Sequence, residues 1–133
     1  LGLTCHFHGV AQKPGKPMGF WAGPGCQVYA LPGNPLSTLC CLHHYVIPAL
    51  RSALGLRPTP PARQVELSET YPVREDFLVF LPVSLEPGNR ARPCPPQNSG
   101  DLVRILDSDG YITIPAGCDQ ASAGSVHDFF PWL

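Results

Sequence analysis

The chain has 133 residues, of which 44% are hydrophobic, and a formal net charge of -1. This length suits one or two small domains with a packed core, and the near-neutral charge excludes a global attraction to nucleic acid or to an anionic membrane. The longest apolar stretch, residues 36–50, contains polar residues and is shorter than the roughly 20 residues of a membrane span. We therefore expect no nucleic-acid partner and no membrane insertion.

The first 56 residues carry the pattern of an α/β domain. Strands are predicted over residues 3–10, 18–22 and 26–31, with a turn at 23–25. Pro32 and Gly33 break the last strand, and Asn34 is a good N-cap for a helix over 36–54 with Pro35 at its first position. Pro48 is expected to kink this helix and Gly55 to end it.

A proline-rich segment over residues 57–62 is predicted to be an extended linker between two domains, 1–56 and 63–133. The second domain is expected to be β-rich, with one short helix over 99–106 that Ser99 can cap. Its predicted strands cover residues 64–70, 76–83, 91–94, 111–114 and 125–130. Short strands at this spacing are typical of a small β-barrel or sandwich.

Both lysines of the chain lie in one proline-braced loop, Lys13-Pro14-Gly15-Lys16-Pro17. The prolines reduce the backbone freedom of the loop before anything binds, and the compact ammonium charge suits a compact anion. After one intervening strand, the turn around Asn34 opens a helix, and Ser37 adds a hydroxyl in its first turn. Together the two loops indicate a small-anion site, although each alone could be an ordinary solvated turn or a plain strand-to-helix connection.

Other side chains are assigned to packing or turns. His43 and His44 are adjacent, and adjacent side chains diverge by about 100° around a helix, so a metal would need ligands from elsewhere. Asp107 and Asp109 lack the later glutamate of a calcium loop and are expected in a turn. The cysteines show no zinc spacing and are expected to be reduced, small core residues of a cytoplasmic protein. They are Cys5, Cys26, Cys40, Cys41, Cys94 and Cys118.

Three segments resemble the MoeA family of molybdopterin molybdenumtransferases, which includes the E domain of gephyrin. They read GVAQKPGKPMGFW, VYALPGNPLSTLCCLHHYVIPAL and NSGDLVRILDSDGYITIPAG. The resemblance implies the C-terminal half of a three-layer α/β (MogA-like) domain, followed by a small β-barrel or sandwich domain. It also implies a cytoplasmic homodimer that inserts molybdate into adenylylated molybdopterin, with Mg²⁺ cleaving the adenylate.

The same resemblance implies roles for particular residues. Lys13, Lys16 and Ser37 match the catalytic loops beside the oxyanion. The matching substrate-binding positions are Pro17, Gly33, Asn34, Pro35 and Ser99, the last of which would close the site of a partner subunit. No metal ligand is assigned within this chain.

The chain departs from the family in two respects. Many members carry an arginine facing molybdate where this chain has Val79, so that charge is missing unless Arg74 or Arg104 replaces it. The metal-binding acidic residues and the first two domains of the family precede the region that this chain matches. We therefore expect part of a longer enzyme that is inactive alone. The alternative is a non-catalytic binding or dimerisation module, or an inactive truncated fragment.

Overall fold

The computed structural model describes residues 2–59, 63–73, 76–97, 101 and 105–132. The chain divides into two compact units, Leu1–Pro58 and Thr59–Leu133, called here the N-terminal unit and the C-terminal unit. The predicted linker over 57–62 includes residues 60–62, which lie outside the described part. The domain limits 1–56 and 63–133 therefore stay a prediction.

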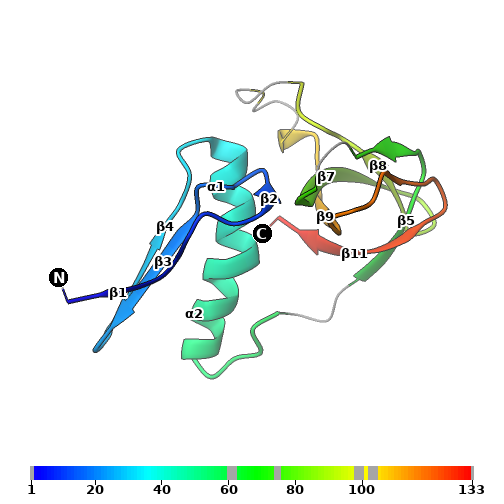
Figure 1. The fold of residues 1–133 in the computed structure, drawn as a ribbon. Helices are drawn as coiled ribbons and strands as arrows, with labels where there is room; N and C mark the ends of the chain where they lie inside the picture. Colours follow the sequence, from blue (N-terminus) through cyan, green and yellow to red (C-terminus); the bar gives the residue numbers. More distant parts are fainter. Residues whose placement is uncertain (1, 60–62, 74–75, 98–100, 102–104, 133) are drawn as a thin grey trace. The chain divides into compact units, whose positions relative to one another are not determined.

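The N-terminal unit contains an antiparallel sheet in the order β1-β3-β4 (Figure 1). Its strands are β1 (Thr4–His8), β3 (Gly19–Gly23) and β4 (Cys26–Ala30), and a short strand β2 (Gln12–Lys13) follows β1. The tight turn between β3 and β4 pairs Gly23 with Cys26, as the Pro-Gly signal predicts. On this sheet Phe20 packs against Tyr29, with ring centroids 4.7 Å apart. The three predicted strands are confirmed.

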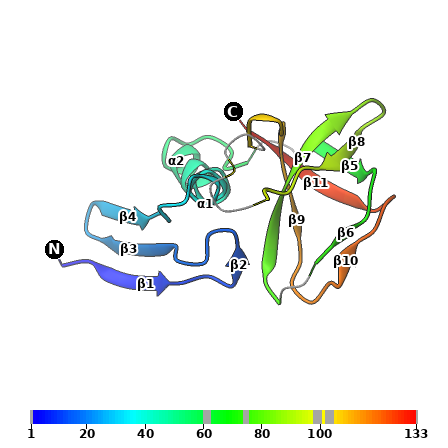
Figure 2. The ribbon, with the colours of Figure 1, turned by 90° about the horizontal axis from the view of Figure 1, so that it is seen from above.

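One long helix runs beside this sheet, as Figures 1 and 2 both show. It comprises α1 (Pro35–Cys41), the π-helical segment η1 (Leu42–Val46) and α2 (Ile47–Ala53). The Ile47 N–H donates to the Leu42 carbonyl, five residues back, directly before Pro48. Proline lacks an N–H and its ring crowds the carbonyl four residues earlier, and a wider π turn accommodates both defects. Where the sequence predicts a kink, the structure therefore has a π-helical segment.

Gly55, which follows the C-cap Leu54, terminates the helix as predicted. Gly55 has a φ of 72°, which side-chain-bearing residues rarely adopt. Its N–H donates to the Ser52 carbonyl at 3.0 Å, and the Leu56 N–H donates to the Arg51 carbonyl at 2.9 Å. These two bonds form a Schellman motif, which satisfies carbonyls that the end of the helix would otherwise leave unpaired.

The C-terminal unit contains a closed five-stranded barrel (Figure 2). Neighbours pair in the order β7-β8-β5-β11-β9, and β9 pairs again with β7, which closes the sheet. These strands are β5 (Arg63–Leu67), β7 (Leu78–Glu86), β8 (Arg90–Pro93), β9 (Gly110–Ile114) and β11 (Val126–Pro131). A separate pair joins β6 (Tyr71–Pro72) to β10 (Gln120–Ala121). Closure decides between the two predicted architectures: the unit is a barrel.

Alternation along the strands places one set of side chains inside this barrel. Val79, Leu81 and Val83 of β7 belong to the buried core, together with Ile112 and Ile114 of β9. Strand side chains alternate between faces, so a period of two fills the interior with branched apolar groups. The predicted helix over 99–106 includes residues 99, 100 and 102–104, which are outside the described part; residues 105 and 106 are helical.

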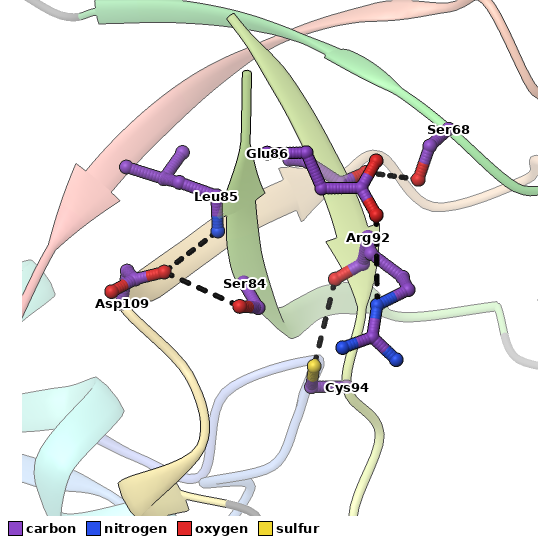
Figure 3. A network of polar contacts seen from close by, with 8 residues as sticks. Ser68, Ser84, Leu85, Glu86, Arg92, Cys94 and Asp109 are labelled. Atoms are coloured by element: carbon purple, nitrogen blue, oxygen red, sulfur yellow. Dashed lines mark hydrogen bonds and ion pairs between the residues drawn. The ribbon is translucent and has the colours of Figure 1, made fainter.

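Asp109 fastens the start of β9 to β7 (Figure 3). Its carboxylate accepts from the Leu85 N–H at 2.7 Å and from the Ser84 hydroxyl at 3.4 Å. Its own N–H donates to the Val83 carbonyl at 2.9 Å. The carboxylate thus serves a turn, the role that the sequence predicts for this segment. Among the residues that the structure describes, no group of three or more His, Cys, Asp or Glu could hold a metal ion.

The six cysteines are all free, but they divide by exposure. Cys40, Cys41 and Cys94 are buried, as expected of small core residues, whereas Cys5 and Cys26 are exposed on the strands β1 and β4. The core assignment is therefore wrong for these two. The residue pattern of these strands does not distinguish an exposed cysteine from a buried one. No helix of the described residues has the length and apolarity that crossing a membrane demands.

Alkaline pH is expected to destabilise the N-terminal unit through Cys40. Burial, and next the neighbouring Cys41, raise the pKa of the Cys40 thiol from 9.0 to about 12. The folded state keeps this proton while the unfolded chain releases it above pH 9, so stability is lost between pH 9 and about 12, by roughly 1.4 kcal/mol per pH unit. Urea unfolding at successive pH values should show a flatter decline for Cys40→Ala. Equal slopes for both proteins would contradict this.

Candidate functional site

The loop that carries both lysines closes on itself through backbone hydrogen bonds. The Val10 N–H donates to the Lys16 carbonyl at 2.9 Å, and the Met18 N–H donates to the Gly15 carbonyl at 3.1 Å. Lys13, Lys16 and the following Pro17 are exposed, whereas Met18 is fully buried. The backbone of the loop is therefore closed from within, and its cationic side chains lie at the surface.

A buried glutamine attaches this loop to the helix. Gln12 is 1% exposed, and its Nε2 donates to the Gly15 carbonyl at 3.1 Å and lies 3.4 Å from the Cys41 sulfur. Its Oε1 accepts from the hydroxyl of Tyr45, one helical turn after Cys41. A buried amide is costly unless it is hydrogen-bonded, and here both ends of the amide have partners. The contact therefore favours one position of the loop on the helix.

The second loop is organised by its N-cap. The Oδ1 of Asn34 accepts from the Ser37 N–H at 3.2 Å and from the Ser37 hydroxyl at 3.3 Å. The Thr38 hydroxyl also bonds to the carbonyls of Pro32 and Asn34. Ser37 is only 7% exposed and its hydroxyl donates within the loop. An anion would receive that hydroxyl only after it leaves Asn34, so the loop offers fewer ready donors than its sequence indicates.

Both loops are attached to the same helix. Asn34 caps its start, and the lysine loop contacts it at Cys41, seven positions later along the chain. Seven residues of α-helix correspond to about 10 Å of axial rise. The loop that carries the lysines is therefore attached to this helix at Cys41 and, through Gln12, at Tyr45.

The histidines in this helix do not add positive charge at neutral pH. Burial lowers the pKa of both His43 and His44 below the ordinary 6.5. Burial raises the pKa of Tyr45, and the nearby Cys41 raises it further, so the Tyr45 hydroxyl stays protonated and able to donate. Neither histidine therefore adds to the positive charge that Lys13 and Lys16 bring to their loop.

The remaining predicted positions are less informative. Gly33 and Pro35 are exposed beside Asn34. Val79, which stands where the family arginine was expected, is 8% exposed and belongs to the barrel core. Ser99, Arg74 and Arg104 lie outside the described residues.

The sequence did not single out Gln12 or Tyr45. Their contact spans 33 positions along the chain. The one available signal is the spacing of Cys41 and Tyr45, since residues four apart share a helix face. Nothing in the sequence shows which loop residue would meet that face.

Comparisons with known proteins agree with the two-unit organisation. Residues 64–132, more than half of the chain, match the MoeA C-terminal region (domain IV). Residues 1–52 match the probable molybdopterin binding domain.

Individual relatives are similar over nearly the whole chain. A molybdopterin molybdenumtransferase of Synechocystis is 36% identical over 99% of this chain and 33% of its own length. The molybdenum cofactor synthesis protein cinnamon of Drosophila melanogaster is 28% identical over 98% of this chain and 23% of its own length. The crystal structure of a molybdopterin biosynthesis moeA protein from Pyrococcus horikoshii superposes with a TM-score of 0.83 at 25% identity, covering 98% of this chain and 33% of that one. The chain thus spans about a third of these relatives or less.

Proposed function

The chain belongs to the MoeA family, and from this premise we propose that it is part of a molybdopterin molybdenumtransferase. In this proposal it contributes to molybdenum cofactor biosynthesis in the cytoplasm. The substrates are molybdate and adenylylated molybdopterin, and the working form is a homodimer. The relatives that carry the transferase name support this proposal. Because this chain covers only 33% of the length of the first of them, we propose that it supplies part of the enzyme.

The observation that carries the proposal is the lysine loop, a closed turn with two exposed ammonium groups three residues apart. Molybdate is a tetrahedral dianion, and ammonium groups held beforehand in one region neutralise it without paying for reorganisation. Lys13 and Lys16 would bind its oxygens. Ser37 would act beside them as a hydroxyl donor after leaving Asn34.

The other proposed contacts shape the substrate pocket. Pro17, Gly33, Asn34 and Pro35 would line the side nearest the pterin. Ser99 would approach from the partner subunit. These assignments rest on family membership and on the order of the motifs along the chain.

Magnesium does not fit the residues that the structure describes, because they contain no group of three or more metal-binding side chains. When bound, Mg²⁺ would assist adenylate cleavage. We propose that its ligands come from other parts of a longer protein. The 133-residue chain alone is therefore expected to bind the oxyanion without turning over adenylylated molybdopterin.

Tungstate, a molybdate analogue of the same charge, tests this function. Isothermal titration of the chain should show saturable binding at low ionic strength. The affinity should fall as salt rises, because screening weakens attraction between exposed charges. Absence of any binding at low salt would contradict the proposal, and product formation at an ordinary rate would contradict the expected inactivity.

A second candidate is a non-catalytic binding or dimerisation module, or an inactive fragment. It is favoured by the size of the buried cluster in the C-terminal unit, whose described members extend from Val65 to Phe129. A module whose stability resides in its barrel would form a stable dimer without oxyanion affinity. Sedimentation analysis beside the titration separates the two candidates.

A further inference from the structure

We propose that Gln12 and Tyr45 are positioning residues, which set the place of the oxyanion-binding lysines by latching their loop to the helix. The inference rests on the proposed function for the identity of the anion. The latch itself stands on the contacts between the loop and the helix. We call the Gln12–Tyr45 hydrogen bond, together with the Gly15–Cys41 contact, the loop latch.

The first argument is the burial of a polar amide directly before a lysine. Gln12 precedes Lys13, yet its side chain is 1% exposed. An apolar side chain at this position would pack against the helix in several ways. The amide is stable only where each end meets its partner, namely the Gly15 carbonyl on one side and the Tyr45 hydroxyl on the other. The polar network therefore specifies one loop position, whereas simple apolar burial would tolerate several.

The second argument is the fit of Gly15 against the helix. A Cβ atom at this position would lie 2.7 Å from the Cys41 sulfur and 2.7 Å from the Gln12 amide nitrogen. Gly15 also has a φ of 106°, which strains any residue with a side chain. The loop backbone thus leaves no room for a side chain at this position. Lys16 follows Gly15 directly, so the contact of Gly15 with the helix also fixes the position of the Lys16 Cα.

The third argument is that the latch joins the two halves of the proposed site without occupying it. Tyr45 and Cys41 lie on the helix whose start is capped by Asn34. Gln12 and Tyr45 use their polar atoms on each other, on Gly15 and on Cys41. Their effect on an anion must therefore be indirect, through where Lys13 and Lys16 stand.

Tyr45→Phe removes the hydroxyl alone and is the first test. Tungstate affinity should fall roughly fivefold to twentyfold, the equivalent of one lost buried hydrogen bond. Amide exchange should accelerate at Val10 and Met18, whose N–H groups are held by the closed loop. Tyr29→Phe is the matched control, since the Tyr29 hydroxyl bonds to the exposed Gln27 at 3.3 Å and leaves the loop untouched.

A double variant separates positioning from general stability. Gln12→Met combined with Tyr45→Phe replaces both polar partners by apolar groups of similar size, so the free energy of unfolding should recover towards that of the wild type. The affinity should stay low, because apolar packing no longer specifies one loop position. Recovery of affinity together with stability would overturn the positioning role.

Every outcome decides the inference. Equal tungstate affinity in the wild type and Tyr45→Phe would overturn it. If the wild type binds no tungstate, the proposed function fails, and amide exchange alone decides the latch. Faster exchange at Val10 and Met18 in Tyr45→Phe, with Tyr29→Phe unchanged, supports it. Unchanged exchange in both tyrosine variants overturns it.

Discussion

Lys16→Ala is expected to weaken tungstate binding by this chain at least tenfold. A charge-assisted hydrogen bond contributes about 1.5–3 kcal/mol, and each 1.4 kcal/mol corresponds to about a factor of ten in affinity. The loop is already closed in the free chain, so little of this energy is spent on ordering it. Titration at several salt concentrations should also show a smaller salt dependence, because one of the two lysine charges is gone.

Two variants control for charge and for shape. Arg51→Ala removes the same unit charge from the last turn of α2, where the Arg51 Nε donates to the Arg57 carbonyl, and should leave the affinity unchanged. Lys16→Arg keeps the charge but spreads it over a planar group, and should bind with intermediate affinity. If Arg51→Ala lowered the tungstate affinity as much as Lys16→Ala does, the affinity would depend on net charge, and the lysine loop would not be the anion site.

The sequence predicted the local framework of the N-terminal unit because its signals are local. The turn at 23–25, the cap at Asn34 and the end at Gly55 each depend on the conformational preference of one or two residues. Such preferences act on neighbouring backbone and need no knowledge of distant parts. The strand predicted over residues 76–83 is present as β7, but its continuous apolar run over 78–83 does not show which side chains face the core.

The features that the sequence did not reveal depend on contacts between distant residues, or on a choice between conformations of similar energy. Closure of the barrel depends on β9 pairing with both β11 and β7, which alternation alone does not specify. Pro48 predicts an irregularity in the helix but not whether it is a kink or a π turn, since both relieve the same crowding. The exposure of Cys5 and the Gln12–Tyr45 bond depend on which surfaces meet. The candidate site was thus visible as two motifs, while the contacts that hold them were not.

Gly110→Ala is expected to destabilise the C-terminal barrel by about 3 kcal/mol or more, a large part of the 5–15 kcal/mol typical of a folded domain. Gly110 pairs with Pro131 of β11 and with Val83 of β7, so it stands where three strands meet. A Cβ atom there would collide with the Phe130 carbonyl oxygen and would lie 2.7 Å from the ring of Phe129, which is 4% exposed. A closed barrel cannot shift one strand without breaking pairing on both sides.

Gly117→Ala provides the matched control. Gly117 has a φ of 80° but nothing within 4 Å of its added Cβ, so the variant should lose only about 1 kcal/mol from backbone strain. Urea unfolding can be followed through Trp132, whose indole donates to the Ser108 hydroxyl at 2.9 Å, in a Trp21→Phe background that silences the other tryptophan. If Gly110→Ala lowered the free energy of unfolding no more than Gly117→Ala, the barrel would be able to accommodate a side chain where these strands meet. The close approach of β9 to β11 would then be a consequence of glycine at this position and no requirement of closure.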